Sequence, residues 1–155
     1  MAGEKHDEEE HSHGHEHTEV ELEEERQKMV KNFHEAGKIA GSILHEVQKL
    51  VLPGESLFDI AESLEKMIID AGGRPAFPAN ISINDIAAHF TPELENKTLV
   101  GETDVVKIDI GVHIEGCIGD TAITVDLSNE QGKLVESSEA ALAAGAEALG
   151  VEHPA

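Results

Sequence analysis

The feature that most constrains this chain is a β-prone run that has two bare carboxylates, Asp109 and Asp120, inside its two expected strands. The run is KIDIGVHIEGCIGDTAITVDL, residues 107–127. Apolar side chains alternate along it, and Glu115-Gly116 offers a tight turn with glycine where a positive φ is favoured. The run therefore predicts a two-stranded hairpin with Asp109 on one strand and Asp120 on the other.

Strand alternation predicts that both aspartates point to one face of this hairpin. Since the turn lies near Glu115, Asp109 and Asp120 become nearly cross-strand neighbours, and their carboxylates should meet. The residues expected on the opposite face are Val106, Ile108, Ile110 and Val112 on the first strand and Thr121, Ile123, Val125 and Leu127 on the second.

Two neighbouring carboxylates need compensation. Opposed like charges destabilise a sheet, so a sheltered pair must share a proton, find cations or bind metal. A pair of divalent ions would suffice, because carboxylates can chelate or bridge two ions set about 3.5 to 4 Å apart. The alternative is a pair of exposed aspartates whose charge is screened by water. Alternation alone leaves both interpretations open.

Helical periodicity dominates the chain before the hairpin. Apolar residues at steps of three and four predict a long amphipathic helix over 29–51, which Pro53 and Gly54 end. Ser56 is then expected to cap a second helix, which ends at Gly72. His34 and His45, on the first helix, are expected at its surface or boundary.

Residues 74–92, RPAFPANISINDIAAHFTP, connect these helices to the hairpin. Their two X-Pro pairs favour extended backbone, and Ile81 and Ile83 predict a short strand, so the segment is interpreted as loop, strand and loop. An alanine-rich third helix is expected over 134–149. The predicted order is tail, two helices, strands and helix.

Residues 1–19 contain almost no side chain that could be buried, and they predict a disordered acidic tail. Within it, the alternating His11, His13, His15 and His17 could chelate a transition metal such as Zn, Ni or Cu.

Charge and composition exclude several classes of function. With 32 acidic and 11 basic residues the formal charge is -21, which excludes nucleic-acid binding through a basic patch. The chain shows no secretory signal and no apolar stretch of about 20 residues, so no membrane association is expected. The single cysteine, Cys117, fits a reducing cytosol and is expected to be a packed residue rather than a nucleophile. We therefore expect a cytoplasmic protein.

Two segments together resemble the methionine aminopeptidase family. Residues 107–127 are similar to its metal-binding hairpin, in which two aspartates eleven positions apart ligate a dinuclear metal centre, and Asp109 and Asp120 have this spacing. Residues 74–92 resemble the segment that carries the family's substrate-contacting histidine. There, FPANISIN running into AAHFTP is more similar to the type II, archaeal and eukaryotic, branch than to the bacterial type I branch. The resemblance covers roughly residues 29–149.

The resemblance implies roles for four residues. Asp109 and Asp120 would be metal ligands, and His89 would be the catalytic imidazole that contacts the substrate near the scissile amide. Phe77 would line the pocket for the methionine side chain. Without the resemblance, His89 would be interpreted as a loop histidine hydrogen-bonded to backbone, and His113, at the turn, is better explained as exposed.

The resemblance also implies a fold and a reaction. The fold is an α/β (α+β) pita-bread fold, in which two related halves of curved antiparallel sheet are backed by helices and hold the metals between them. The reaction is hydrolytic removal of the N-terminal methionine from nascent chains, with two divalent ions, Co, Mn, Fe or Zn, activating a water. The family completes the ligand shell with one histidine and two glutamates from its C-terminal half.

No residue here matches those later ligands. His153 and the helix residues Glu136, Glu139 and Glu147 lie outside the family's motifs. Residues 20–155 therefore resemble the N-terminal half of a truncated type II enzyme, which is expected to be inactive alone. Its open sheet edge would favour association with the missing half or with itself. The alternatives are a catalytically silent binding protein of this fold, as among histone-chaperone and ribosome-associated relatives, and a proline-specific peptidase.

Overall fold

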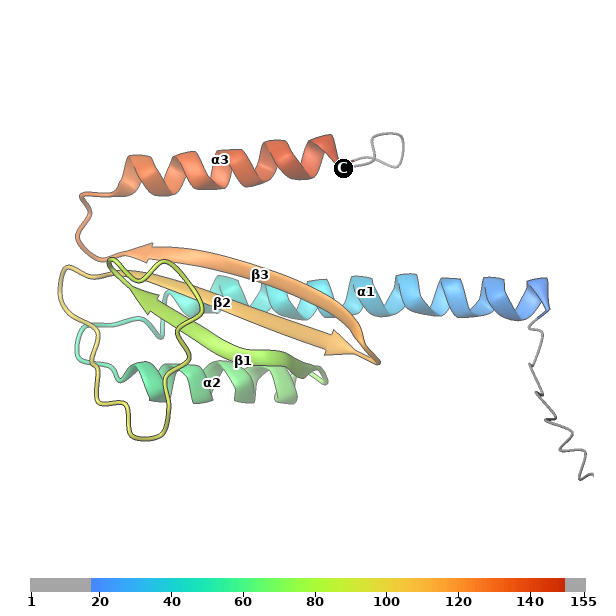
Figure 1. Cartoon of the computed structure of the whole chain (residues 1–155), viewed down its shortest axis with the longest axis horizontal. Helices are drawn as coiled ribbons and strands as arrows, with labels where there is room; N and C mark the ends of the chain where they lie inside the picture. The colour runs from blue at the N-terminus through green and yellow to red at the C-terminus, as the bar shows by residue number, and fades with distance from the viewer. Residues whose placement is uncertain (1–17, 150–155) are drawn as a thin grey trace, which may run out of the picture.

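The computed structural model describes residues 18–149, which form a three-stranded antiparallel sheet and three helices (Figure 1). This α+β arrangement and the order of its elements match the prediction. The elements are α1 (Glu19–Val47), α2 (Leu57–Asp70), β1 (Arg74–Ile83), β2 (Val105–Ile114), β3 (Cys117–Asp126) and α3 (Gly132–Ala148).

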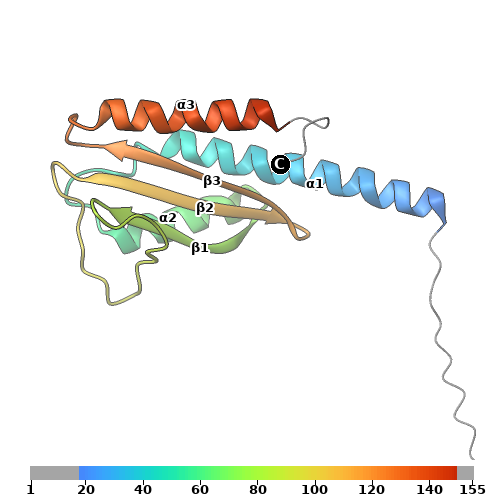
Figure 2. The same cartoon turned by 45° about the horizontal axis from the view of Figure 1, so that its top comes forward.

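The helices occupy different places around the sheet. Helix α1 packs against β2 and β3, and α2 packs against β1, so the two helices back one face of the sheet. Helix α3 runs beside β3, and none of its residues is buried (Figure 2). Within residues 18–149, the opposite face of the sheet is therefore covered by this loosely packed helix and by part of the loop between β1 and β2.

Helix α1 starts earlier than the apolar periodicity predicts. Its first residue is Glu19 rather than Met29, because Thr18 and Glu21 form a capping box at its start. The Thr18 Oγ1 accepts a hydrogen bond from the Glu21 backbone N–H at 3.3 Å, and the Glu21 carboxylate accepts one from the Thr18 N–H at 2.8 Å. Glu19, the last residue of the predicted tail, therefore belongs to the helix. Residues 1–17, with the histidine cluster, lie outside the described part. The helix also ends four residues early, at Val47, in turns that precede Pro53.

Strand β1 is longer than the predicted short run at Ile81 and Ile83. It begins at Arg74 and includes both prolines, with register shifts on either side of Phe77. The sheet order is β1-β2-β3, so β1 lies at an edge where a missing proline N–H disturbs no second neighbour.

The hairpin forms as predicted. Ile114 pairs with Cys117, and the two residues between them, Glu115 and Gly116, have φ of 49° and 85°. These angles are those of a type I′ turn, whose twist matches that of the flanking strands. Cys117 is 4% exposed, which confirms that it is a packed residue.

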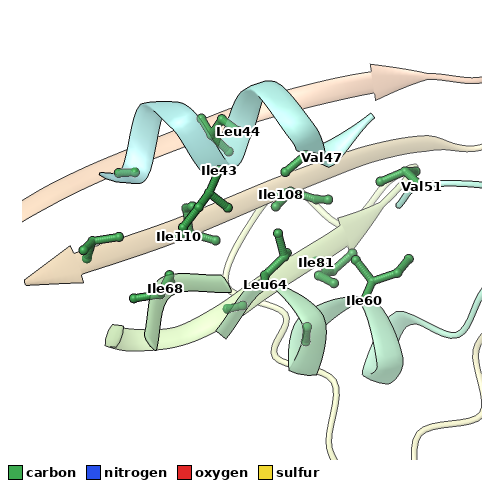
Figure 3. Packing of buried hydrophobic residues seen from close by; sticks show 14 of the residues in the cluster. Ile43, Leu44, Val47, Val51, Ile60, Leu64, Ile68, Ile81, Ile108 and Ile110 are labelled. Carbon is green, nitrogen blue, oxygen red and sulfur yellow. The ribbon is translucent and has the colours of Figure 1, made fainter. Parts of the chain in front are cut away.

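The hydrophobic core lies between the sheet and the two backing helices (Figure 3). Ile43 and Val47 of α1 face Ile108 and Ile110 of β2 there, and Leu64 of α2 completes the contact. Each predicted apolar residue of the first hairpin strand is fully buried in this core. Those residues are Val106, Ile108, Ile110 and Val112. The apolar face is thus confirmed, and the aspartates belong to the other face.

Within residues 18–149 there is no helix that is long and apolar enough to cross a membrane.

Candidate functional site

Asp109 and Asp120 lie on the sheet face that is turned away from the core. Their strands pair so that Asp109 is opposite Ala122 and Asp120 is opposite Gly111. The aspartates are therefore a diagonal pair on one face, two positions apart in register, rather than directly opposed. Asp109 is half-buried and Asp120 is exposed.

Burial and the negative charge of Asp120 both affect the pKa of the Asp109 carboxyl. Burial raises the pKa of the Asp109 carboxyl, and the negative charge of Asp120 raises it further. A hydrogen bond from the Asn80 side chain and the charge of His89 act in the opposite direction but are outweighed. The ionised pair is thus destabilised in the absence of a cation.

Asn80 of β1 is a site residue that the sequence analysis missed. It pairs with Asp109 across the sheet, and its side chain also accepts a hydrogen bond from the Thr91 hydroxyl at 2.8 Å. The strand pattern offered a signal, because Asn80 alternates with the buried Ala79 and Ile81 and must point to the face of the aspartates.

His89 lies in the loop between β1 and β2, on the same side of the sheet as Asp109. Its φ is 60°, in the left-handed region, and its side chain is exposed. The next residue, Phe90, accepts a backbone hydrogen bond from Ile81 at 2.7 Å, which folds the loop back onto β1. His89 and Asp109 line one cleft of about 250 Å³, which α3 closes on the other side with Leu142.

Phe77 also reaches this face. A Cβ placed on Gly111 would lie 2.3 Å from Cε1 of the Phe77 ring, so the ring lies directly over Gly111. Gly111 is the cross-strand partner of both Phe77 and Asp120. The ring therefore sits beside the aspartates, and all four residues singled out by the sequence lie on one side of the sheet.

Three further histidines lie outside this cleft. The His113 Nδ1 accepts a hydrogen bond from the Gly116 backbone N–H at 3.3 Å, so His113 supports the hairpin turn and is half-buried rather than fully exposed. His34 and His45 are exposed on α1, as predicted. A hollow of about 730 Å³ between Lys107 and Leu134 includes neither aspartate.

The donor set fits a divalent cation but does not complete its shell. Two carboxylates supply the hard oxygen ligands that divalent ions accept, and a cation would offset the repulsion at Asp109. Between residues 18 and 149, however, no group of three or more His, Cys, Asp and Glu side chains is placed to hold a metal ion. Further ligands would have to come from elsewhere.

The chain was compared with models of known protein families. Residues 31–153 match the model of metallopeptidase family M24. The chain belongs to this family. The first twelve residues of α1, Glu19–Val30, lie before the matched region.

Archaeal methionine aminopeptidases are similar to this M24 chain. The enzyme of Methanocaldococcus jannaschii is 55% identical over 108 residues, which cover 70% of this chain and 37% of the relative. The enzyme of Pyrococcus horikoshii is 49% identical with the same coverage. That of Thermococcus kodakarensis is 46% identical over 117 residues, 76% of this chain and 38% of the relative. The M24 chain thus spans well under half the length of these relatives.

Solved structures confirm the fold. The methionine aminopeptidase of Thermotoga maritima matches with a TM-score of 0.62 and 28% identity, over 71% of this chain and 47% of that one. The enzyme of Rickettsia prowazekii matches with a TM-score of 0.61 and 26% identity, over 77% and 48%. The prolidase of Pyrococcus furiosus, at 18% identity and a TM-score of 0.54, over 63% of this chain and 31% of that one, shares the fold. The predicted pita-bread fold, in its N-terminal half, is therefore confirmed.

Proposed function

We propose that this chain is the N-terminal half of a type II methionine aminopeptidase, which removes the N-terminal methionine from nascent proteins. The observation that carries the proposal is the pair Asp109 and Asp120, set on one face of a hairpin in a chain that is 55% identical to an archaeal methionine aminopeptidase. The unit would extend over residues 20–155, and we propose that it acts in the cytoplasm.

In this proposal, Asp109 and Asp120 would hold two divalent ions, Co, Mn, Fe or Zn. When bound, such ions would supply an activated water and polarise the carbonyl of the N-terminal methionine, whose amide bond to the next residue is broken. The chain's own task is to fix the two carboxylates, which β2 and β3 do by holding both strands in one register. His89 would contact the substrate near the scissile amide from the cleft that it shares with Asp109.

Phe77 would bind the methionine side chain. Its ring is half-buried and lies over Gly111, so an apolar surface stands next to the two carboxylates. Met side chains make favourable contacts with aromatic rings, which suits this role. We assign Phe77 to substrate binding and His89 to substrate binding and catalysis.

Since two carboxylates are too few to complete the coordination of two ions, we propose that the remaining ligands come from a second half. The 155-residue chain alone should then release no more than trace methionine from a Met-Ala-containing peptide with Mn or Co. Ordinary turnover by this chain would contradict the need for a second half.

A chimera tests the function directly. The 108 matched residues of this chain would replace the corresponding segment of the Methanocaldococcus jannaschii methionine aminopeptidase. The chimera should release methionine from the Met-Ala peptide, and Asp109→Asn or Asp120→Asn should reduce release to background. Glu62→Gln, which changes an exposed carboxylate on α2, serves as the matched control and should retain activity.

The chimera also separates the peptidase from a catalytically silent binding protein of the same fold. A folded chimera that takes up no Mn²⁺ and releases no methionine would favour the silent protein. If the chimera is active and both Asp→Asn variants keep full activity, Asp109 and Asp120 are not the metal ligands.

A further inference from the structure

We propose that Asn80 is a positioning residue whose single side-chain amide joins the carboxylate of Asp109 to the loop that carries His89. The roles of Asp109 and His89 rest on the proposed function. The joint itself rests on hydrogen bonds and strand register within the described chain.

The register places Asn80 beside Asp109. Across the three strands one row of side chains runs Asn80, Asp109 and Ala122, and all three project to the face turned away from the core. The methyl group of Ala122 offers no hydrogen bond. Asn80 is therefore the lateral neighbour that can hold the Asp109 carboxylate in one orientation.

Thr91 determines which end of the Asn80 amide faces Asp109. Its hydroxyl donates to the Asn80 Oδ1 at 2.8 Å, so the acceptor end of the amide is already used. The Nδ2 donor end remains for the carboxylate, and hydrogen bonding by Asn80 lowers the pKa of Asp109 against the larger effect of burial. One carboxylate position is thereby fixed while the rest of its lone pairs stay available for a cation.

The same amide anchors the loop. Thr91 follows Phe90, whose carbonyl accepts a hydrogen bond from the Ile81 N–H at 2.7 Å. Two consecutive loop residues are thus bound to two consecutive residues of β1, Asn80 and Ile81. His89 immediately precedes this anchored pair, so its left-handed backbone is fixed relative to Asp109.

The choice of an amide has a charge consequence. An aspartate at position 80 could still accept from Thr91, but its ionised side chain could not donate to Asp109. It would also add a third carboxylate to a face where Asp109 and Asp120 already repel each other. Asparagine at position 80 orients the Asp109 carboxylate and holds the His89 loop without adding charge.

The first test is made on the metal-free, ¹⁵N-labelled 155-residue chain by NMR. Nuclear Overhauser effects (NOEs) should link the Asn80 Nδ2 protons to Asp109, and the Ile81 amide should be protected from hydrogen exchange. Thr91→Val replaces the hydroxyl with a methyl group of similar size, so it should weaken the NOE and speed Ile81 exchange several-fold. Thr91→Ser keeps the hydroxyl and should restore both. Thr91 is exposed, so these variants should fold, and the amide spectrum checks this.

The second test is a Mn²⁺ titration of the same samples, read from paramagnetic broadening of the Asp109, Gly111 and Asp120 amides. The Mn²⁺ concentration at half broadening should rise about tenfold in Asn80→Ala and Thr91→Val and return in Thr91→Ser. Thr98→Val is the control, because it makes the same substitution at the far end of the loop. There the Thr98 backbone carbonyl, which the substitution keeps, accepts a hydrogen bond from the Leu57 N–H, so the Mn²⁺ midpoint should not change.

The two tests separate the proposals. If Mn²⁺ broadens none of these amides in the unaltered chain, Asp109 and Asp120 do not hold Mn²⁺ without a second half and the chimera decides on the metal, while the NOE and the exchange rates still decide on the joint. If Thr91→Val leaves the NOE and the Ile81 exchange unchanged, the joint is overturned. Equal Mn²⁺ midpoints for the unaltered chain, Asn80→Ala and Thr91→Val would also overturn it.

Discussion

Gly119 of β3 lies directly against Gly37 of α1. A Cβ on Gly119 would be 2.7 Å from the Gly37 backbone nitrogen and 2.8 Å from the carbonyl carbon of Ala36. A Cβ on Gly37, by contrast, would meet no atom within 4 Å. The close approach therefore depends on glycine at one of the two positions only.

This asymmetry predicts opposite signs for the same substitution. Gly119→Ala should destabilise the chain by about 2 kcal/mol, because the methyl group meets helix backbone that cannot rotate away. Gly37→Ala should stabilise it by roughly 0.5 kcal/mol through higher helix propensity. Urea denaturation followed by circular dichroism measures both, and two changes of the same sign would contradict the packing.

Gly111→Ala tests the position of the Phe77 ring. The new methyl group would overlap Cε1, so the ring must leave its place at a cost of about 1 kcal/mol. Phe77 ring proton shifts should change, and in a double-mutant cycle Phe77→Ala should abolish the cost of Gly111→Ala. Additive costs would mean that the ring does not lie over this glycine in solution.

Asp109→Asn should stabilise the metal-free chain while removing a proposed ligand. It removes a half-buried charge that faces Asp120, and relief of such cross-strand repulsion contributes about 0.5 kcal/mol after solvent screening. The thermal midpoint without divalent ions should rise by a few degrees. Asp85→Asn, at an exposed loop position, is the matched control. A fall in the midpoint for Asp109→Asn would show that the pair is not repulsive.

Thr18→Ala should loosen the start of α1 without unfolding the core. The capping box contributes about 1 kcal/mol, but the first turns of the helix extend past the end of the sheet (Figure 1). Hydrogen exchange at the Glu21 amide, which donates to Thr18, should become about fivefold faster. The global thermal midpoint should stay unchanged, and Thr103→Ala serves as the control.

Asp126 gives the connection to α3 a dependence on pH. Hydrogen bonds from the side chain of Ser128, and from the backbone N–H groups of Gln131 and Ser128, hold the pKa of Asp126 below its usual value. A depressed pKa in the folded state contributes stability above the unfolded pKa, and this contribution is lost as the pH falls through the folded value. The midpoint difference between the unaltered chain and Asp126→Asn should therefore be largest near neutral pH and shrink below about pH 4. A difference that is constant with pH would contradict these bonds.

Local rules account for much of the fold. The turn at Glu115 and Gly116 follows from glycine's tolerance of positive φ, and the strand faces follow from alternation. The early start of α1 was missed because apolar periodicity is weak before Met29, although Thr18 and Glu21 carry the capping signal.

The site was only partly predictable for a different reason. Alternation placed Asp109 and Asp120 on one face. Their offset of two positions in the strand register depends on the length of the turn, because the turn determines which residues of β2 and β3 pair. The contact between Asn80 and Thr91 depends on a long loop that folds back on β1, and no periodic pattern encodes such a return. The assignment of His89 came from family resemblance rather than from spacing.

Helix α3 adds no side chain to the buried core, which is built from α1, α2 and the sheet with Val51 and Val100 from the loops. Proteolysis between Leu127 and Gln131 would therefore detach a separable appendage and leave a self-supporting remnant with every core contact intact.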